Sequence, residues 1–158
     1  MNRCKWCNLK NQKYIYYHDN IWGKLNSSDE YLYKMLILES FQAGLSWECI
    51  LNKIDNFEVN KGIIRNKNKI LASINNSKIF KSIVNEYGSF YKYLCTFTKD
   101  KIYYENNLVT SPLSDAISKD LQKRGMKFVG STIIYSFLQA VGIIYSHEKE
   151  CFLYKSNV

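Results

Sequence analysis

The chain is organised around the stretch Leu38-Glu39-Ser40-Phe41-Gln42-Ala43-Gly44-Leu45-Ser46-Trp47, which combines the end of one predicted helix, a break and the start of another. Apolar residues at helical spacing lead into this stretch, and Gly44 interrupts the pattern. Ser46 is a typical N-cap residue, so Trp47 falls in the first turn of the following helix. The stretch therefore predicts a helix–turn–helix corner.

The predicted corner places one carboxylate, Glu39, opposite one large flat ring, Trp47. This pair suits a flat, cationic, aromatic ligand, because the ring can stack on such a ligand and the carboxylate can meet its charge. A structural alternative explains the same residues, with Trp47 in the core and Glu39 as a solvated residue of an amphipathic helix.

Helices account for most of the structure that the sequence predicts. They span residues 27–43, 47–57, 66–87 (as one or two helices), 114–124 and 131–145. The expected boundary residues are a capping box of Ser27 with Glu30, the caps Ser114 and Ser131 or Thr132, and a terminating Gly88. Residues 90–97 fit a short helix or a strand, residues 98–112 fit a loop, and residues 1–28 fit an irregular segment. Because strand-like alternation is scarce, the predicted fold class is all-α.

Length, charge and cysteine content narrow the class of protein. The chain has 158 residues, one proline and no low-complexity linker, which predicts a single domain over residues 1–158, monomeric by default. The net charge of +8 permits a polyanionic partner, although a composition rich in Lys, Asn, Ile and Tyr is also typical of an AT-biased genome. Five cysteines without an N-terminal leader predict a reduced, cytoplasmic protein. The uncharged run 131–146 is too short to cross a bilayer, so no membrane partner is expected.

The connection between the last two predicted helices reads Arg124-Gly125-Met126-Lys127-Phe128-Val129-Gly130-Ser131-Thr132. It resembles the hairpin of a helix–hairpin–helix DNA-binding element at about residues 115–145. In such an element, glycines let the backbone approach a phosphate, and the free N–H groups of the new helix point at it. An ordinary tight helix–helix connection is the alternative. The candidate DNA contacts are Lys123, Arg124, Gly125, Lys127, Gly130, Ser131 and Thr132.

Cysteine and histidine residues at both ends of the chain form a candidate metal site. His147 and Cys151 are four residues apart, so both would lie on one face of a helix, and Cys4 and His18 lie near the N-terminus. A Cys₂His₂ set suits tetrahedral zinc and leaves no open position, so the site would be structural and would tie the chain ends together. Spacing alone does not choose between His18 and Cys7 as the fourth ligand. Buried thiols and a surface histidine are the alternative without metal.

Several segments match one family pattern in order. The sequence resembles the DNA-3-methyladenine glycosylase I family, bacterial alkylation-repair enzymes of the helix–hairpin–helix glycosylase superfamily. The most specific blocks are Tyr17-His18-Asp19-Asn20-Ile21-Trp22-Gly23 and Gln42-Ala43-Gly44-Leu45-Ser46-Trp47. The matching segments are residues 3–6, 14–23, 38–47, 62–65, 114–119, 123–132, 135–137 and 147–151.

The resemblance implies roles for individual residues. It selects Cys4, His18, His147 and Cys151 as ligands of one structural zinc ion and makes Cys7 a bystander. It implies a base pocket formed by Trp6, Tyr14, Tyr17, Trp22, Glu39 and Trp47. Within that pocket Trp47 would stack on the extruded base, and Glu39 and Tyr17 would hydrogen-bond its edge. Leu45 would wedge into the duplex beside the flipped nucleotide.

The implied substrate is duplex DNA that carries 3-methyladenine, a base already cationic and therefore easily lost. The superfamily usually places a catalytic Asp beyond the hairpin, whereas here no Asp follows Asp120. Glu39 is the best remaining carboxylate, either to orient water or to recognise the base. Bifunctional relatives carry a Schiff-base Lys just after the hairpin, where this chain has Ser131-Thr132. We therefore expect a monofunctional hydrolase that leaves an abasic site.

Two departures from the family pattern keep other functions open. The segment between Trp47 and Gly62 is shorter than the family pattern by roughly two helical elements, and the loop before Pro112 is also short. A non-catalytic helix–hairpin–helix module that senses alkylated bases is the principal alternative. A binding protein with an aromatic cage for cationic heterocycles, without a role in DNA binding, is a second.

Overall fold

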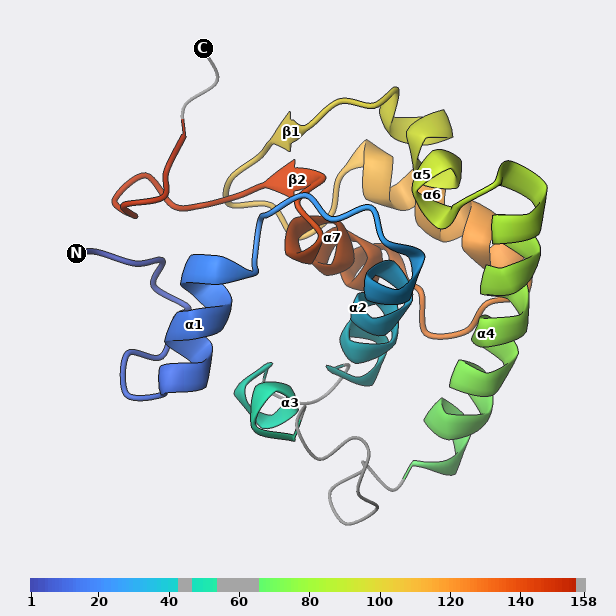
Figure 1. The fold of residues 1–158 in the computed structure, drawn as a ribbon, viewed down its shortest axis with the longest axis horizontal. Coiled ribbons are helices and arrows are strands. Elements are labelled where there is room, and N and C mark those ends of the chain that lie inside the picture. Colours follow the sequence, from blue (N-terminus) through green and yellow to red (C-terminus); the bar gives the residue numbers. More distant parts are fainter. Residues whose placement is uncertain (43–46, 54–65, 156–158) are drawn as a thin grey trace.

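The structure is a computed structural model that describes residues 1–42, 47–53 and 66–155, and only the backbone of residues 49, 52 and 53. Its helices are α1 (Gln12–Asn20), α2 (Asp29–Gln42), α3 (Trp47–Lys53), α4 (Lys67–Tyr87), α5 (Phe90–Thr98), α6 (Pro112–Lys123) and α7 (Ser131–Ala140) (Figure 1). The two strands β1 (Tyr103–Tyr104) and β2 (Ile144–Tyr145) pair in parallel, with Tyr103 opposite Ile144. The predicted all-α class is confirmed, and this short pair is the only sheet in the described ranges.

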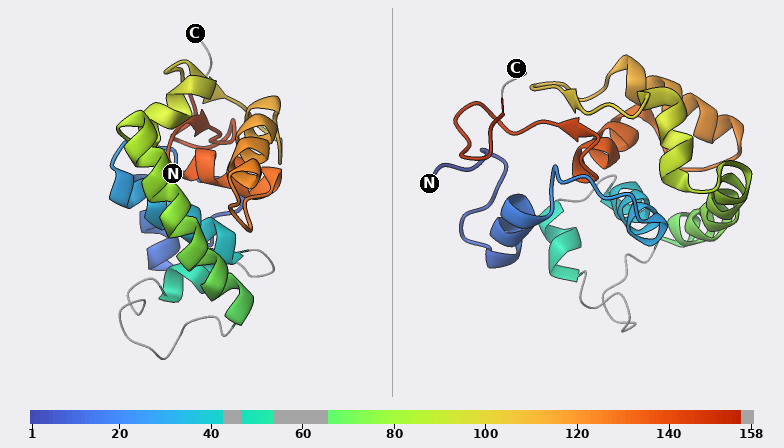
Figure 2. Two further views of the ribbon diagram at one scale, coloured as in Figure 1. Left: turned by 90° about the vertical axis from the view of Figure 1, so that its right-hand side faces the viewer. Right: turned by 45° about the horizontal axis from the view of Figure 1, so that its top comes forward.

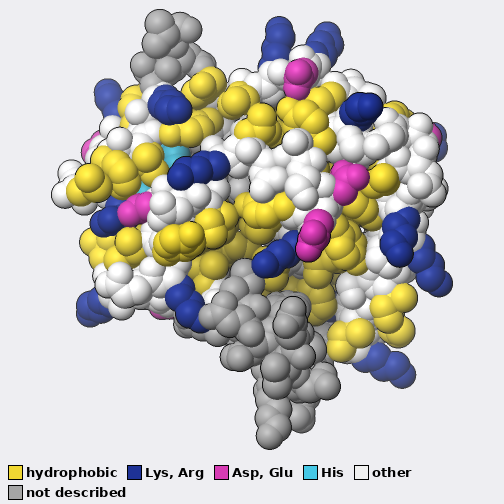
Figure 3. All heavy atoms as spheres, in the orientation of Figure 1, with side chains coloured by type: hydrophobic (Ala, Val, Ile, Leu, Met, Phe, Trp, Pro, Cys, Tyr) yellow, Lys and Arg dark blue, Asp and Glu magenta, His cyan; other side chains and the backbone are white. Residues whose placement is uncertain are grey.

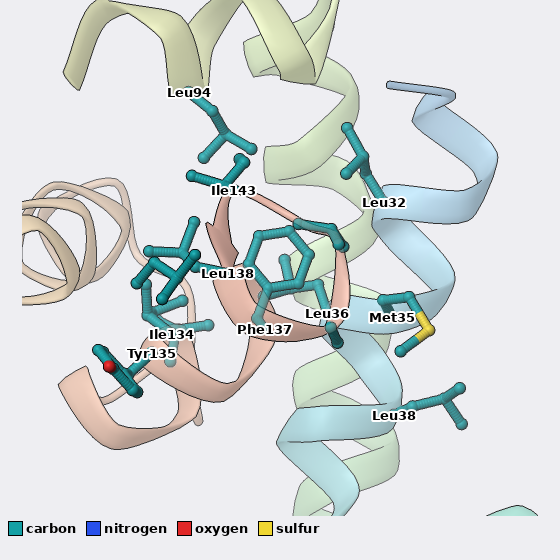
Figure 4. Close-up of a cluster of buried hydrophobic side chains, with 14 of the residues drawn as sticks. Leu32, Met35, Leu36, Leu38, Leu94, Ile134, Tyr135, Phe137, Leu138 and Ile143 are labelled. Atoms are coloured by element: carbon teal, nitrogen blue, oxygen red, sulfur yellow. The ribbon is translucent and has the colours of Figure 1, made fainter. Parts of the chain in front are cut away.

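Helix α7 lies at the centre of the molecule, where it packs against α6 on one side and α2 on the other (Figure 1). Its sequence is apolar on nearly every face, as expected of a fully surrounded helix. Phe137 and Leu138 are completely buried, and the Phe137 ring lies beside Leu36 of α2 (Figure 4). Burial of side chains of this size contributes about 1.5–3 kcal/mol each, so α7 is the main apolar support of the fold.

Helix α4 is the longest helix and runs along one side of the molecule (Figures 1 and 2). The prediction of one or two helices resolves to a single helix, capped by Asn66, whose side chain accepts from the Lys69 amide. Gly88 ends the helix as predicted, with a left-handed φ of 85° that favours glycine. Residues 90–97, predicted as helix or strand, form α5, which is capped by Ser89.

The two ends of the chain lie side by side (Figures 1 and 2). The amide of Phe152 donates to the Asn2 carbonyl at 2.9 Å, and the amide of Lys5 donates to a Glu148 carboxylate oxygen at 2.9 Å. Hydrogen bonds therefore join the termini independently of any metal.

One helix was not predicted, and two predicted helix starts were wrong. Residues 1–28 contain α1, which begins because the Asn11 side chain accepts from the amides of Lys13 and Tyr14. Helix α6 begins at Pro112 and is capped by Ser111; Ser114 is the third residue of that capping box. Helix α2 begins at Asp29, one residue later than the predicted Ser27 cap allows.

The predicted end of the last helix was also wrong. Helix α7 stops at Ala140, and Gly142 follows with a φ of 79°. A Cβ at Gly142 would lie 2.3 Å from the Leu25 nitrogen, so this turn is open only to glycine. The chain leaves the helix here because it packs against the segment between α1 and α2.

Candidate functional site

Cys4, His18, His147 and Cys151 form one buried cluster that could hold a metal ion. Their ligand atoms all lie within 4.8 Å of one another. The Cys4 sulfur is 3.5 Å from His147 Nδ1, and the Cys151 sulfur is 3.5 Å from His18 Nε2. Between the two alternatives for the fourth ligand, this geometry favours His18, because the Cys7 sulfur points to the Tyr14 carbonyl at 3.8 Å.

The chemistry of these four side chains fits a bound cation. His18 Nδ1 lies 2.7 Å from an Asp19 oxygen, and Arg3 holds Asp19 with a nitrogen–oxygen distance of 2.7 Å. A carboxylate on one ring nitrogen fixes the tautomer that presents the other nitrogen to a metal. Burial raises the pKa of the Cys4 thiol and lowers that of His147 to about 4. A cation would offset the cost of burying these sulfurs as thiolates.

His147 and Cys151 meet through a turn, which corrects the predicted helix. The Cys151 amide donates to the Glu148 carbonyl at 2.8 Å. The resulting turn brings the Cys151 sulfur to 3.6 Å from His147 Nδ1. A spacing of four residues therefore places both side chains together without helical backbone.

A cavity of about 200 Å³ lies beside this cluster. All six residues of the predicted base pocket line it. Its lining consists of Trp6, Tyr14, Tyr17, Trp22, Glu39, Gln42, Trp47, Ser136 and Gln139. The volume is smaller than that of sites for drug-sized molecules and suits a single heterocycle.

Aromatic side chains from three parts of the chain enclose the cavity. Tyr17 of α1 lies 5.2 Å from Trp47 of α3 between ring centroids, and Trp6 lies 4.9 Å from Trp22. Trp22 also contacts the metal cluster, since the centroid of its ring is 4.8 Å from that of His147. The candidate metal site therefore supports one wall of the cavity.

Glu39 brings an isolated carboxyl group into this aromatic cavity. The residue is 3% exposed, which excludes the alternative of a solvated surface residue. Its Oε2 has no hydrogen-bond partner in the described part of the chain, and neither does Trp47 Nε1. Burial raises the pKa of Glu39 to about 8. A ligand with a positive charge or a hydrogen-bond donor would satisfy this group.

Gln42, Ser136 and Gln139 also line the cavity, and the sequence analysis did not select them. Gln42 lies one helical turn after Glu39, a spacing that places both on one face. Ser136 and Gln139 are polar positions three residues apart on the otherwise apolar α7. That pattern is the only sequence signal that could have indicated them.

The connection between α6 and α7 presents unused amide groups. The amides of residues 124–126 donate to backbone carbonyls, and that of Lys127 donates to Asn76 Oδ1. In the described ranges, the amides of residues 128–133 have no acceptor within the protein. A Cβ at Gly130 would meet no atom within 4 Å, so the backbone there is open to another molecule. Such a row of N–H groups at a helix start suits an anion.

The predicted DNA-contact side chains differ in their surroundings. Lys123 and Lys127 are exposed, whereas Arg124 donates to Asp120 at 2.8 Å and to Glu86 at 2.7 Å. The hydroxyl of Ser131 donates to Asp115. On the face shown in Figure 3, Lys and Arg are spread over the surface rather than gathered in one patch. The overall positive charge therefore does not mark the interface by itself.

A family model described as methyladenine glycosylase matches residues 6–61 and 53–154. The chain belongs to the methyladenine glycosylase family. The resemblance found in the sequence is thereby confirmed. Leu45, Gly44 and Ser46 lie outside the described residues, as does the segment 62–65, so their predicted roles have no structural test here.

Other methyladenine glycosylases match over nearly the whole chain. DNA-3-methyladenine glycosylase 1 of Escherichia coli (strain K12) is 33% identical over 186 residues, covering 99% of each chain. A crystal structure of 3-methyladenine DNA glycosylase I (TAG) has a TM-score of 0.91 at 33% identity and covers 98% of this chain and 100% of that one. A Staphylococcus aureus structure described as the structural basis of 3-methyladenine recognition has a TM-score of 0.88 at 30% identity, covering 99% of both chains.

This chain is shorter than its Escherichia coli relative. The alignment with that relative extends over 186 residues, whereas this chain has 158. The two matched pieces of the family model overlap at residues 53–61, within the segment that the sequence analysis found to be short. Among the described residues, no helix combines the length and apolar character that a membrane span needs.

Proposed function

We propose that this chain is a monofunctional DNA glycosylase that flips 3-methyladenine out of alkylated duplex DNA and hydrolyses its N-glycosidic bond, leaving an abasic site. The observation that carries this proposal is the buried, unpartnered carboxyl of Glu39 in an aromatic cavity of about 200 Å³. The family assignment and the names of the relatives supply the substrate.

The cavity distinguishes the lesion from normal bases by charge. Methylation at N3 leaves the base cationic in DNA, whereas adenine is neutral. Aromatic faces and a desolvated carboxylate each favour the cation by about 1–2 kcal/mol. The raised pKa of Glu39 keeps its carboxyl largely protonated in the free protein at neutral pH. A bound cation stabilises the ionised form, so the carboxylate develops its charge against the lesion.

Bond cleavage needs little acid catalysis. When the N-glycosidic bond breaks, its electron pair goes to the base, which departs neutral. The sugar becomes oxocarbenium-like and takes up water, which loses a proton. We assign Glu39 to recognition of the cationic base, with electrostatic support to the positive transition state. Trp47 stacks on the extruded base, and Tyr17 hydrogen-bonds its edge.

The proposal of a monofunctional reaction rests on the lining of the cavity. None of its described residues is a lysine, so no amine is present there to form a Schiff base with the sugar. Water is then the attacking group. Attack by water leaves an abasic site and does not cleave the sugar–phosphate backbone of the DNA.

We assign phosphate binding to the hairpin between α6 and α7. The unused amides of residues 128–133 and the exposed side chains of Lys123 and Lys127 support this assignment. These contacts would hold the backbone in the manner of a helix–hairpin–helix element and would carry no sequence information. The hairpin thus binds the backbone of the duplex, and the cavity binds the extruded base.

We further propose that the Cys₂His₂ cluster holds one structural zinc ion. Two sulfur and two imidazole ligands suit tetrahedral zinc. A zinc ion at this site would supply cross-linking rather than chemistry, since all four of its ligands would come from the protein. The rings of Trp6 and Trp22 pack on the ligand histidines, so the bound ion would also hold the cavity wall in place.

Release of free base from methylated duplex DNA tests the proposed activity. The wild-type protein should release 3-methyladenine, resolved by chromatography, and no unmodified adenine. Trp47→Ala should suppress the release, because the stacking surface is lost. The product strand should stay intact until base or heat is added. Duplex binding without any release would indicate the non-catalytic module, and nicking by purified protein would contradict a monofunctional reaction.

A further inference from the structure

The side chain of Asn76 in α4 holds the hairpin through two hydrogen bonds, one to the amide and one to the carbonyl of Lys127. Its Nδ2 donates to the Lys127 carbonyl at 2.8 Å, and its Oδ1 accepts from the Lys127 amide at 2.9 Å. The side chain lies in the interior, with Asn76 1% exposed. Because the two groups belong to the peptide units on either side of Lys127, the paired hydrogen bonds fix the orientation of the Lys127 backbone as well as its position.

The conformation that Asn76 fixes is one that the hairpin would not favour alone. The next residue, Phe128, has a φ of 55°, in the left-handed region that costs about 1–2 kcal/mol for a residue other than glycine. Such a conformation persists where its surroundings determine it. Directly after the clamped residue come the unpartnered amides of residues 128–130. Because the Lys127 carbonyl and the Phe128 amide belong to one peptide unit, the clamp determines which way the Phe128 amide points. The Gly130 amide is held separately, because the Ser118 hydroxyl donates to the Val129 carbonyl of the same peptide unit at 2.7 Å.

We propose that Asn76 is a positioning residue for DNA binding, which holds the Lys127 backbone so that the Phe128 amide, the first of the unpartnered row, faces a phosphate. This role rests on the proposed glycosylase function and deepens it. Asn76 does not touch the DNA itself. It acts through the backbone of Lys127.

The same helix also connects the hairpin to the cavity. Two turns before Asn76, the Nζ of Lys69 donates to the Phe41 carbonyl at 3.0 Å and lies 5.9 Å from the centre of the Phe128 ring. Phe41 follows Glu39 by two residues in α2. Helix α4 therefore sets the spacing between the phosphate-facing amides and the cavity. A flipped nucleotide has its phosphate and base at a nearly fixed separation, so this spacing determines whether both are bound at once.

The neighbouring Asn75 provides a matched control. Its Nδ2 donates to the Gly125 carbonyl at 2.9 Å, but the residue is exposed and makes this single bond to the hairpin. Asn76→Asp and Asn75→Asp each remove one amide donor and add one negative charge in the same region. Because Asn76 is buried and Asn75 is exposed, a difference in duplex binding reports the clamp when the melting temperature shows that both variants are folded. Asn76→Ala and Asn75→Ala form a second pair without the added charge.

The experiment measures three quantities for each variant: the Kd for an undamaged duplex, the Kd for free 3-methyladenine, and the melting temperature. Loss of both hydrogen bonds of the clamp should weaken duplex binding by Asn76→Ala about 10- to 100-fold. The Asn75 variants should stay within about 3-fold of the wild type, because an exposed hydrogen bond contributes little. Binding of free 3-methyladenine should be unchanged in all variants, since the cavity is intact.

Two results would overturn the positioning role. One is that both Asn76 variants bind the undamaged duplex with the same Kd as the Asn75 variants. The other is a parallel loss of duplex and free-base binding, which would indicate a general structural role. If Asn76→Ala melts below the assay temperature, Asn76→Asp, which has the same shape and keeps the acceptor for Lys127, decides the question. A wild-type protein that binds no duplex would overturn the proposed function and the positioning role together, so the two failures are distinguishable.

Discussion

Glu39 shows how one residue can be costly to the fold and useful to the site. The described residues that line the cavity around this carboxyl include aromatic rings but no lysine or arginine. Burial raises the pKa of Glu39 to about 8. A group of this kind favours folding less than a surface glutamate does. Functional sites are where such costs are retained, since the missing partner is the ligand.

The stability cost of Glu39 should depend on pH. Between its ordinary pKa of 4.5 and the raised value of about 8, the folded protein binds more protons than the unfolded chain, so the free energy of unfolding falls as pH rises. Glu39→Gln removes this dependence. The variant should equal the wild type below about pH 4.5 and exceed it above pH 8 by on the order of a few kcal/mol. Denaturant unfolding at several pH values measures the difference, and a gap that does not grow with pH would contradict the burial of an ionisable carboxyl.

At the scale of elements, the α6–α7 connection combines an open backbone with exposed charge. Lys127 takes part in both features. Its backbone, which Asn76 holds, leads into the open amides, and its exposed side chain can reach a phosphate. Arg124 differs, because Glu86, Asp120 and the Tyr87 hydroxyl hold its guanidinium on the protein. Lys127 and Arg124, both predicted as DNA contacts, therefore differ in how readily their side chains can reach a phosphate.

Lys127→Ala should weaken binding to all duplexes alike, with or without the lesion. Removal of one phosphate contact should lower the slope of log Kd against log salt concentration by about 1. Titrations of methylated and undamaged duplexes between low and moderate salt measure both effects. A loss confined to methylated DNA would place Lys127 in the base pocket instead of the phosphate site.

The candidate metal cluster joins the N-terminal segment, with Cys4 and His18, to the C-terminal segment, with His147 and Cys151. Cys151→Ser should lose the bound metal and lower the melting temperature together, because metal binding contributes directly to folding. Metal analysis of the purified protein and thermal unfolding provide the two readouts. Cys7→Ser is the control, since the Cys7 thiol is also buried but lies outside the cluster. Metal that survives Cys151→Ser and falls with Cys7→Ser would show that the ligand set is wrong.

At the scale of the whole molecule, the parts that local sequence determines were the parts that could be predicted. Gly88 ends α4 in a left-handed cap, a conformation that favours glycine, and the family blocks located the cavity residues before the structure did. The end of α7 could not be predicted in this way. It depends on how closely Gly142 approaches Leu25, a contact between segments more than a hundred residues apart.

The same distinction applies to the candidate site. The metal residues were predictable as a set, but the backbone that joins His147 to Cys151 was predicted as helix and is a turn. Ser136 and Gln139 enter the cavity only because α7 packs against α2. Helix α1 was missed because its apolar pattern is weak and its start depends on the Asn11 cap. Tertiary packing, which the sequence does not display, decided where Ser136 and Gln139 lie, whereas α1 depends on a local cap that the apolar pattern did not reveal.

The most direct measurement is the single-turnover rate of 3-methyladenine release from methylated duplex DNA by the wild type and by Glu39→Gln, with the Kd for undamaged duplex measured alongside. The substitution keeps the shape of the side chain and removes its charge. If the buried carboxylate recognises the cationic base, release should fall about 10- to 100-fold, equivalent to roughly 1.5–3 kcal/mol, while duplex binding stays unchanged. Release by Glu39→Gln at the wild-type rate would show that the carboxylate is not what selects the alkylated base.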